Sequence, residues 1–143
     1  MSKDAKSNLQ TILNLAEIKE NNAARMLANA QKVMGENQTK LNELQVFLAD
    51  YQKPSLTPVN AYQLQSTRQF LIQLNEVIKL QEQQLALSKC AMLKEKDNWL
   101  VHRVKSKSIE KIVEKRLLKE EKTKQKKEET ELDEISAQFK TFF

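Results

Sequence analysis

The sequence predicts an all-α protein in which two long helices fold back on each other as an antiparallel coiled-coil hairpin, the second helix longer than the first. The 143-residue chain has only one Gly and two Pro, so it can reverse direction only rarely. Charged residues make up 30% of it and aromatic residues 6%, a composition typical of long helices. Apolar residues recur with a seven-residue period on both sides of one Pro-containing interruption. We therefore expect residues 1–143 to form a single domain, buried along a narrow seam.

The first helix is expected over about residues 5–53. Two seam positions alternate along it, one with three consecutive alanines and the other mostly Leu or Met. They are Leu9, Ala16, Ala23, Ala30, Asn37, Leu44 and Tyr51 for the first, and Leu13, Glu20, Leu27, Met34, Leu41 and Leu48 for the second. This period of 3.5 residues is that of a coiled-coil strand, and the alanines allow a partner helix to approach closely. Glu20 and Asn37 interrupt the pattern, and we expect them either to adjust the register between the helices or to lie at an edge of the seam.

The turn is expected over residues 54–60. Pro54 disfavours helical geometry at Lys53 and so ends the first helix. Thr57 followed by Pro58 is typical of an N-cap and a first helical residue, and Asn60 is a second candidate cap. A connection this short makes the two helices antiparallel.

The second helix is expected over about residues 61–140. One seam position is apolar throughout, whereas the other is apolar only near the turn. The first comprises Leu64, Leu71, Ile78, Leu85, Met92 and Trp99, and the second Thr67, Leu74, Gln81, Ser88 and Glu95. No Gly or Pro follows the turn, so this helix is about 120 Å long, against about 70 Å for the first.

The difference in length predicts a helical overhang. With the turn centred near Thr57, Leu9 lies opposite a residue near position 105, and the chain beyond about Ile109 has no partner helix in its own chain. Two apolar stripes lie in this region, Ile109, Ile112, Val113 and Leu117 in one and Leu132, Ile135, Phe139 and Phe142 in the other. Apolar stripes on an unpartnered helix indicate contact with another protein.

Residues that carry chemistry are scarce. Gly35 is the only glycine, so a phosphate-binding loop cannot form. His102 is the only histidine, which argues against a metal pair or a catalytic triad. Cys90 is the only cysteine and is expected to be buried. We therefore expect no enzymatic activity, no cofactor and no bound metal.

The charge pattern restricts the partners. The formal net charge is +5, yet the four lysines Lys122, Lys124, Lys126 and Lys127 are interleaved with glutamates and lack neighbouring aromatic residues. This argues against binding to nucleic acid or lipid and favours a solvated face or contact with an acidic protein groove. The N-terminal residues lack the apolar stretch of a signal peptide, and no apolar run approaches the length of a transmembrane segment. A cytoplasmic protein is expected.

Aromatic residues gather near the turn. Phe47, Tyr51, Tyr62 and Phe70 all lie within about four helical turns of it, and Phe47 and Phe70 fall outside the two seam positions. These rings either form a docking surface or close the end of the coiled coil, and the sequence leaves both alternatives open.

Four segments resemble a known family. The segments LAEIKENNAARML, KLNELQVFLADYQ, RQFLIQLNEVI and EKRLLKEEKTKQKKEETELDEISAQF are similar to the FliJ family of flagellar type III export. The resemblance covers most of the chain. It implies a coiled coil that looks like the central stalk of rotary ATPases, located in the cytoplasm at the inner membrane. The implied partners are the hexameric export ATPase, the cytoplasmic domain of the export gate, and substrate chaperones that the protein escorts.

The resemblance also implies two binding surfaces. The positions matching the gate-binding surface are Leu44, Phe47, Tyr51, Phe70 and Leu74, with departures from the family pattern at Lys40 and Gln81. The termini are implied to enter the ATPase ring, and the apolar residues expected to seat there are Leu117, Leu132, Ile135 and Phe139. The alternatives are the equivalent stalk of a virulence injectisome, a structural coiled coil that binds only itself, and a nucleic-acid-binding hairpin.

Overall fold

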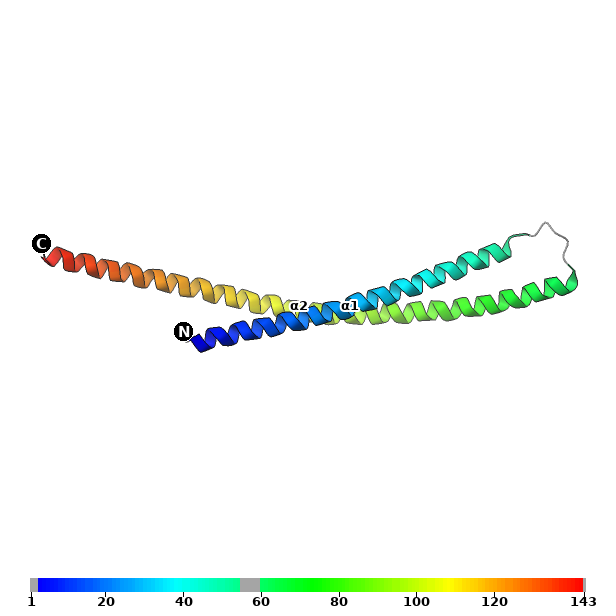
Figure 1. Cartoon of the computed structure of the whole chain (residues 1–143), viewed down its shortest axis with the longest axis horizontal. Coiled ribbons are helices and arrows are strands. Elements are labelled where there is room, and N and C mark those ends of the chain that lie inside the picture. Colours follow the sequence, from blue (N-terminus) through cyan, green and yellow to red (C-terminus); the bar gives the residue numbers. More distant parts are fainter. Residues whose placement is uncertain (1–2, 55–59, 143) are drawn as a thin grey trace. The chain divides into compact units, whose positions relative to one another are not determined.

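The protein consists of two long helices that pack against each other in antiparallel orientation (Figure 1). Helix α1 spans Lys3–Gln52 and helix α2 spans Ala61–Phe142. The structure is a computed structural model that describes residues 3–54 and 60–142. The predicted fold, a two-helix hairpin with a longer second helix, is confirmed.

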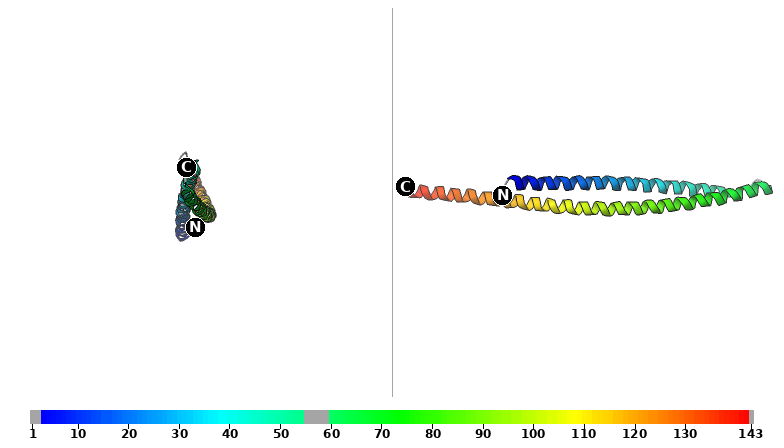
Figure 2. Two further views of the ribbon diagram at one scale, coloured as in Figure 1. Left: turned by 90° about the vertical axis from the view of Figure 1, so that its right-hand side faces the viewer. Right: turned by 90° about the horizontal axis from the view of Figure 1, so that it is seen from below.

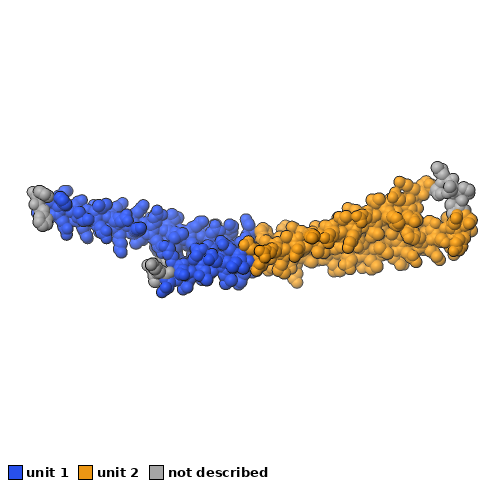
Figure 3. Space-filling view, viewed as in Figure 1, with its two compact units in different colours: residues 1–20, 101–143 blue, residues 21–100 orange. Residues whose placement is uncertain are grey.

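The chain divides into two compact units (Figure 3). Unit 1 combines residues 1–20 with 101–143, and unit 2 comprises residues 21–100. In each unit a stretch of α1 lies beside a stretch of α2, so each has its own interhelical seam.

The seam of unit 2 follows the predicted heptad positions. Its buried core consists of Leu41, Leu74, Ile78 and Leu85. Met34, Leu44, Leu48 and Phe70 pack against this core and are partly buried. Seven of these eight residues occupy predicted seam positions, and Phe70 immediately precedes one. The heptad pattern therefore identified which face of each helix is buried.

Two polar side chains in the seam of unit 2 donate hydrogen bonds to main-chain oxygens. The Gln81 side-chain amide donates to the backbone oxygen of Asn37 at 3.0 Å and lies 3.3 Å from its Oδ1 atom. The buried Ser88 hydroxyl donates to the Leu85 carbonyl oxygen at 2.8 Å. The predicted role of Asn37 at the seam is consistent with this pairing, because a polar pair across a coiled coil favours one register over its neighbours.

Asn60 is the N-cap of α2. Its Oδ1 atom accepts a hydrogen bond from the Gln63 backbone N–H at 2.7 Å, and its carbonyl oxygen accepts one from the Leu64 N–H. This is the geometry of an N-cap residue. Of the two candidate caps, Thr57 with Pro58 lies outside the described residues. The first turns of α2 extend past the last turn of α1 (Figure 2), and the predicted seam residue Leu64 is exposed there.

The interhelical pairing in unit 1 extends further along α2 than predicted. Lys6 Nζ lies 2.8 Å from Glu120 Oε2, and Ile109 and Val113 are half-buried. The prediction that the chain beyond about Ile109 lacks a partner was wrong. Asn37 pairs with Gln81, so the mean of their residue numbers is 59, whereas the predicted turn centre was residue 57. The pairing is shifted toward higher residue numbers on α2 because the first turns of α2 have no α1 neighbour.

The Cys90 prediction was also wrong, because the thiol is exposed. Cys90 lies two residues after the buried Ser88 and two before the half-buried Met92. Two residues correspond to about 200° around a helix, which turns Cys90 away from the seam. Its heptad position, rather than the usual burial of free cysteine, decides its exposure.

Candidate docking surfaces

Three aromatic rings meet in unit 2 near the end of α1. The ring centroids of Tyr51 and Phe70 are 4.6 Å apart, those of Phe47 and Tyr51 are 5.0 Å apart, and those of Phe47 and Phe70 are 6.1 Å apart in an edge-to-face arrangement. We call these three residues the aromatic cluster. Phe47 and Tyr51 are each 46% exposed, whereas Phe70 is half-buried against the core. The cluster thus joins the two helices and also presents ring surface to solvent.

The other two predicted gate-binding residues lie beneath this cluster. Leu74 is only 7% exposed and belongs to the core, and Leu44 is partly buried against the same core. The structure therefore brings all five predicted residues together, but in two layers. Leu74 supports the rings from below and offers little surface of its own.

A shallow groove adjoins the aromatic cluster. It is lined by Lys40, Glu43, Leu44, Phe47 and Gln81. Lys40 and Gln81 are the two positions at which the sequence departs from the expected pattern, and the structure places both beside Phe47. The polar groups at this edge of the surface are thus a lysine ammonium group, a glutamine amide and the carboxylate of Glu43.

A second candidate surface is the part of α2 that continues past the start of α1 (Figure 2). We call residues 121–142 the C-terminal overhang. Every residue from 121 to 141 is exposed. Leu132, Ile135 and Phe139 are 63%, 55% and 64% exposed, and their spacing of three and four residues places them on one helical face. An exposed apolar face of this kind is suited to contact with another protein.

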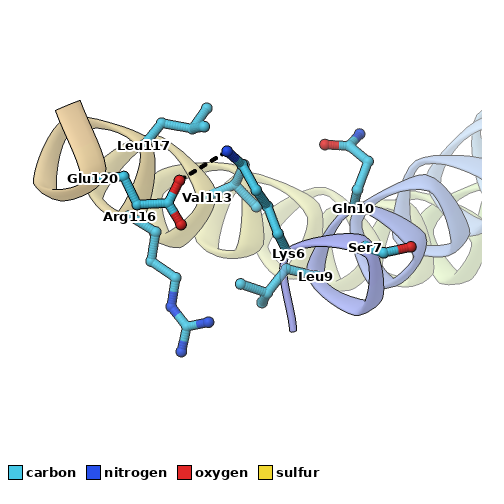
Figure 4. Close-up of a pocket in the computed structure, with 8 residues that line it drawn as sticks. All are labelled: Lys6, Ser7, Leu9, Gln10, Val113, Arg116, Leu117 and Glu120. Carbon is cyan, nitrogen blue, oxygen red and sulfur yellow. Dashed lines mark ion pairs between the residues drawn. The ribbon is translucent and has the colours of Figure 1, made fainter. Parts of the chain in front are cut away.

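The structure separates Leu117 from the other three predicted ring-binding residues. Leu117 lines a pocket between the first turns of α1 and the stretch 113–120 of α2 (Figure 4). The lining residues are Lys6, Ser7, Leu9, Gln10, Val113, Arg116, Leu117 and Glu120. Leu117 therefore lies beside α1 at the base of the overhang, rather than on its exposed face.

An ion pair closes one side of this pocket. The Lys6 ammonium group donates to the Glu120 carboxylate, as the dashed line in Figure 4 shows. This hydrogen bond lowers the pKa of Glu120, and the charges of Lys6 and Arg116 add to the effect. Extending the seven-residue series from Trp99 through Ser106 and Val113 leads to Glu120, so heptad counting places Glu120 on the seam but does not identify Lys6 as its partner.

Basic residues line a second groove on the same stretch of α2. Its lining comprises Arg116, Lys119, Glu120, Thr123, Lys124 and Lys127. Five of these side chains carry charge, and four of the five are positive. This stretch of the surface is therefore predominantly basic, and both alternatives left by the sequence, a solvated face and contact with an acidic protein groove, stay open.

The described residues meet neither the requirements of a metal site nor those of a membrane span. Among residues 3–54 and 60–142, no group of three or more His, Cys, Asp or Glu side chains is arranged to hold a metal ion. Neither described helix contains a segment long and apolar enough to cross a membrane.

These features define an antiparallel two-helix hairpin with exposed apolar and aromatic side chains. The sequence model of the FliJ family, described as flagellar FliJ protein, matches residues 5–139. The chain belongs to this family and is therefore a flagellar export-related protein. No curated protein and no solved structure matches the chain.

Proposed function

We propose that this protein is a non-enzymatic stalk of the flagellar export apparatus that couples the hexameric export ATPase to the export gate. It acts as one coiled-coil domain in the cytoplasm and is held at the inner membrane through its partners. Family membership supports the export role. The observation that carries the stalk role is the C-terminal overhang, a helix exposed from residue 121 to residue 141 with an apolar face.

The overhang binds the ATPase ring. Leu132, Ile135 and Phe139 seat against the ring because burial of their exposed side chains removes apolar surface from water. Leu117 contributes at the base of the overhang, where it also packs near α1. A ring that surrounds the overhang satisfies the apolar face, which is exposed in the free protein.

The aromatic cluster binds the cytoplasmic domain of the export gate. Phe47 and Tyr51 supply the accessible ring surface, while Phe70, Leu44 and Leu74 hold the rings in place. Large, rigid aromatic side chains near the centre of an interface commonly supply much of its binding energy. Escort of substrate chaperones is part of the same proposal and is supported by family membership alone.

The ring contact is tested by co-purification with the hexameric export ATPase, scored by the rate of ATP hydrolysis. Ile135→Glu places a charge on the apolar face and is expected to abolish stimulation of hydrolysis. Ala137→Glu is the matched control, because Ala137 is exposed on the opposite face of the same helical segment. Stimulation by the control should equal that of the unaltered protein.

Truncation after Glu120 provides an independent variant. It removes the overhang but keeps the Lys6–Glu120 ion pair, so the hairpin should remain helical by circular dichroism. Loss of stimulation with retained helix content supports the proposal. Full stimulation by the truncated protein, or equal losses for Ile135→Glu and Ala137→Glu, rejects the overhang as the ring contact.

A further inference from the structure

The two edges of the seam in unit 2 differ in polarity. One edge consists of the residues that immediately precede the Leu13–Leu48 seam series on α1 and the Leu64–Trp99 seam series on α2. They are Met26, Val33, Lys40 and Phe47 on α1 and Phe70, Val77, Gln84 and Ala91 on α2. The opposite edge consists of Ala24, Gln31, Gln38 and Gln45 on α1 and Arg68, Asn75, Glu82 and Lys89 on α2. Six of eight residues are apolar on the first edge and one of eight on the second. If both edges only faced solvent, both would be expected to be polar.

Two contacts show that the apolar edges of both helices face the same side. Phe47 and Phe70 each precede a seam residue, and their rings meet edge to face at 6.1 Å. The groove beside Phe47 is lined by the edge residue Lys40 and by Gln81 from the opposite helix. The apolar edge of α1 and that of α2 therefore border one common face of unit 2.

Further apolar side chains widen this face away from the aromatic cluster. We call it the apolar face, and its residues are Met26, Val33, Val77, Leu80 and Leu87. All five are exposed, and Leu87 is 65% exposed. On each helix they recur at intervals of three or seven residues, as in the seam of a coiled coil. A third helix laid along the face would bury them in the same manner as the existing seam.

The charges along the rim indicate the chemistry of that helix. Glu36, Glu43 and Asp50 recur every seven residues along the α1 rim and are all exposed. Successive carboxylates are thus about 10 Å apart along the helix axis. Lys40 lies between the first two, and Lys53 Nζ forms an exposed ion pair with Asp50 Oδ1 at 3.3 Å. The three carboxylates therefore exceed these two ammonium groups by one negative charge. Basic side chains at the same seven-residue spacing would complement it, as flanking charges do in coiled-coil pairing.

We propose that the apolar face is a docking site for an amphipathic helix of another protein, with one apolar side and with Lys or Arg every seven residues along the edge facing α1. This interaction is separate from the ring contact of the overhang and extends the accessible surface of unit 2 beyond the aromatic cluster. The docked helix converts the two-helix seam into a three-helix arrangement.

The test uses the full-length protein and two fluorescein-labelled helical peptides of three heptads each. Both carry Leu at the seam positions, and one flanking position per heptad is Lys in the first peptide and Glu in the second. Fluorescence anisotropy should show that the Lys peptide binds about tenfold more tightly, because three flanking charge pairs together contribute about 1.4 kcal/mol. Equal binding of both peptides, or binding of neither, overturns the proposal.

Substitutions then locate the site. Leu87→Glu on α2 and Val33→Glu on α1 should each weaken binding of the Lys peptide by about tenfold or more. Ile72→Glu is the matched control, because Ile72 is an exposed apolar residue of α2 outside the apolar face. It should leave the affinity within about twofold. Circular dichroism confirms that each variant retains its helices, and equal losses for Ile72→Glu and Leu87→Glu overturn the assignment.

Charge reversal tests the chemistry of the partner. The triple variant Glu36→Lys, Glu43→Lys and Asp50→Lys should invert the preference, so that the Glu peptide binds more tightly than the Lys peptide. An unchanged preference contradicts the role of the acidic rim. Light scattering of the protein alone tests whether a second copy of this chain occupies the apolar face instead. A concentration-dependent dimer that Leu87→Glu abolishes would show that a second copy binds the apolar face, and would overturn the proposal that a helix of another protein binds there.

Discussion

The side-chain amide of Gln81 lies 3.0 Å from the backbone oxygen of Asn37 and 3.3 Å from its Oδ1 atom, so one polar side chain ties α2 to α1 within the seam. The neighbouring seam positions Ile78 and Leu85 are buried and apolar. A shift of one heptad would place Gln81 against a different partner and leave polar groups unsatisfied. The pair therefore selects one register from several that the leucines alone would permit.

Loss of the Gln81 hydrogen bonds is expected to weaken the hairpin. Gln81→Ala should lower the free energy of unfolding by about 1 kcal/mol, because a part-buried acceptor on Asn37 loses its donor. Gln84→Ala on the same helix is the control, since Gln84 is exposed, and it should change stability by less than about 0.5 kcal/mol. Urea denaturation followed by circular dichroism measures both, and equal effects would contradict a role for the pair.

Two leucines two residues apart should differ sharply in their importance for folding. Leu85 is 6% exposed in the core, whereas Leu87 is 65% exposed. Leu85→Ala should cost about 2–4 kcal/mol through lost burial and the cavity left behind. Leu87→Ala should stay within about 0.5 kcal/mol. Thermal unfolding distinguishes the two, and a large loss for Leu87→Ala would show that its side chain is buried.

The Lys6–Glu120 pair should make the attachment of the first α1 turns sensitive to acid. The hydrogen bond from Lys6 lowers the pKa of Glu120. The ion pair therefore stabilises the folded protein fully at pH values above the pKa that Glu120 has in the unfolded chain. That effect is lost as the pH falls through the lowered pKa of the folded state. The carboxyl ¹³C shift of Glu120 should titrate at lower pH in the unaltered protein than in Lys6→Gln. Identical titration curves would contradict the ion pair in solution.

The aromatic cluster should contribute more to gate binding than to folding. Phe47→Ala combined with Phe70→Ala should preserve helix content, since the buried leucines remain, while weakening binding to the cytoplasmic domain of the export gate by about tenfold or more. Val46→Ala is the control, because Val46 is exposed next to Phe47 and lies outside the cluster. Binding is measured by calorimetry. Loss of helix content in the double variant would instead assign the rings to the core.

Several features followed from the sequence alone. The seven-residue recurrence of Leu71, Ile78 and Leu85 predicted the buried face of α2, and Pro54 predicted the end of α1. These features depend on local backbone geometry and on the period of the helix, both of which are encoded within short stretches of sequence. Gathering of Phe47, Tyr51 and Phe70 near the turn was likewise foreseen from their distance to the turn, and the ring contacts agree with it.

The axial offset between the helices was decided only by the tertiary structure. Counting from an assumed turn centre placed Leu117 in the overhang, whereas it lies beside α1 in the pocket closed by Lys6 and Glu120. Layering within the predicted gate-binding surface was equally hidden, since Leu74 is buried beneath the rings. Heptad patterns specify which residues face the partner helix but are nearly unchanged by sliding that helix along its axis. The offset therefore comes from the sum of many pair contacts and from the unequal helix ends at the turn, which no single segment of the sequence contains.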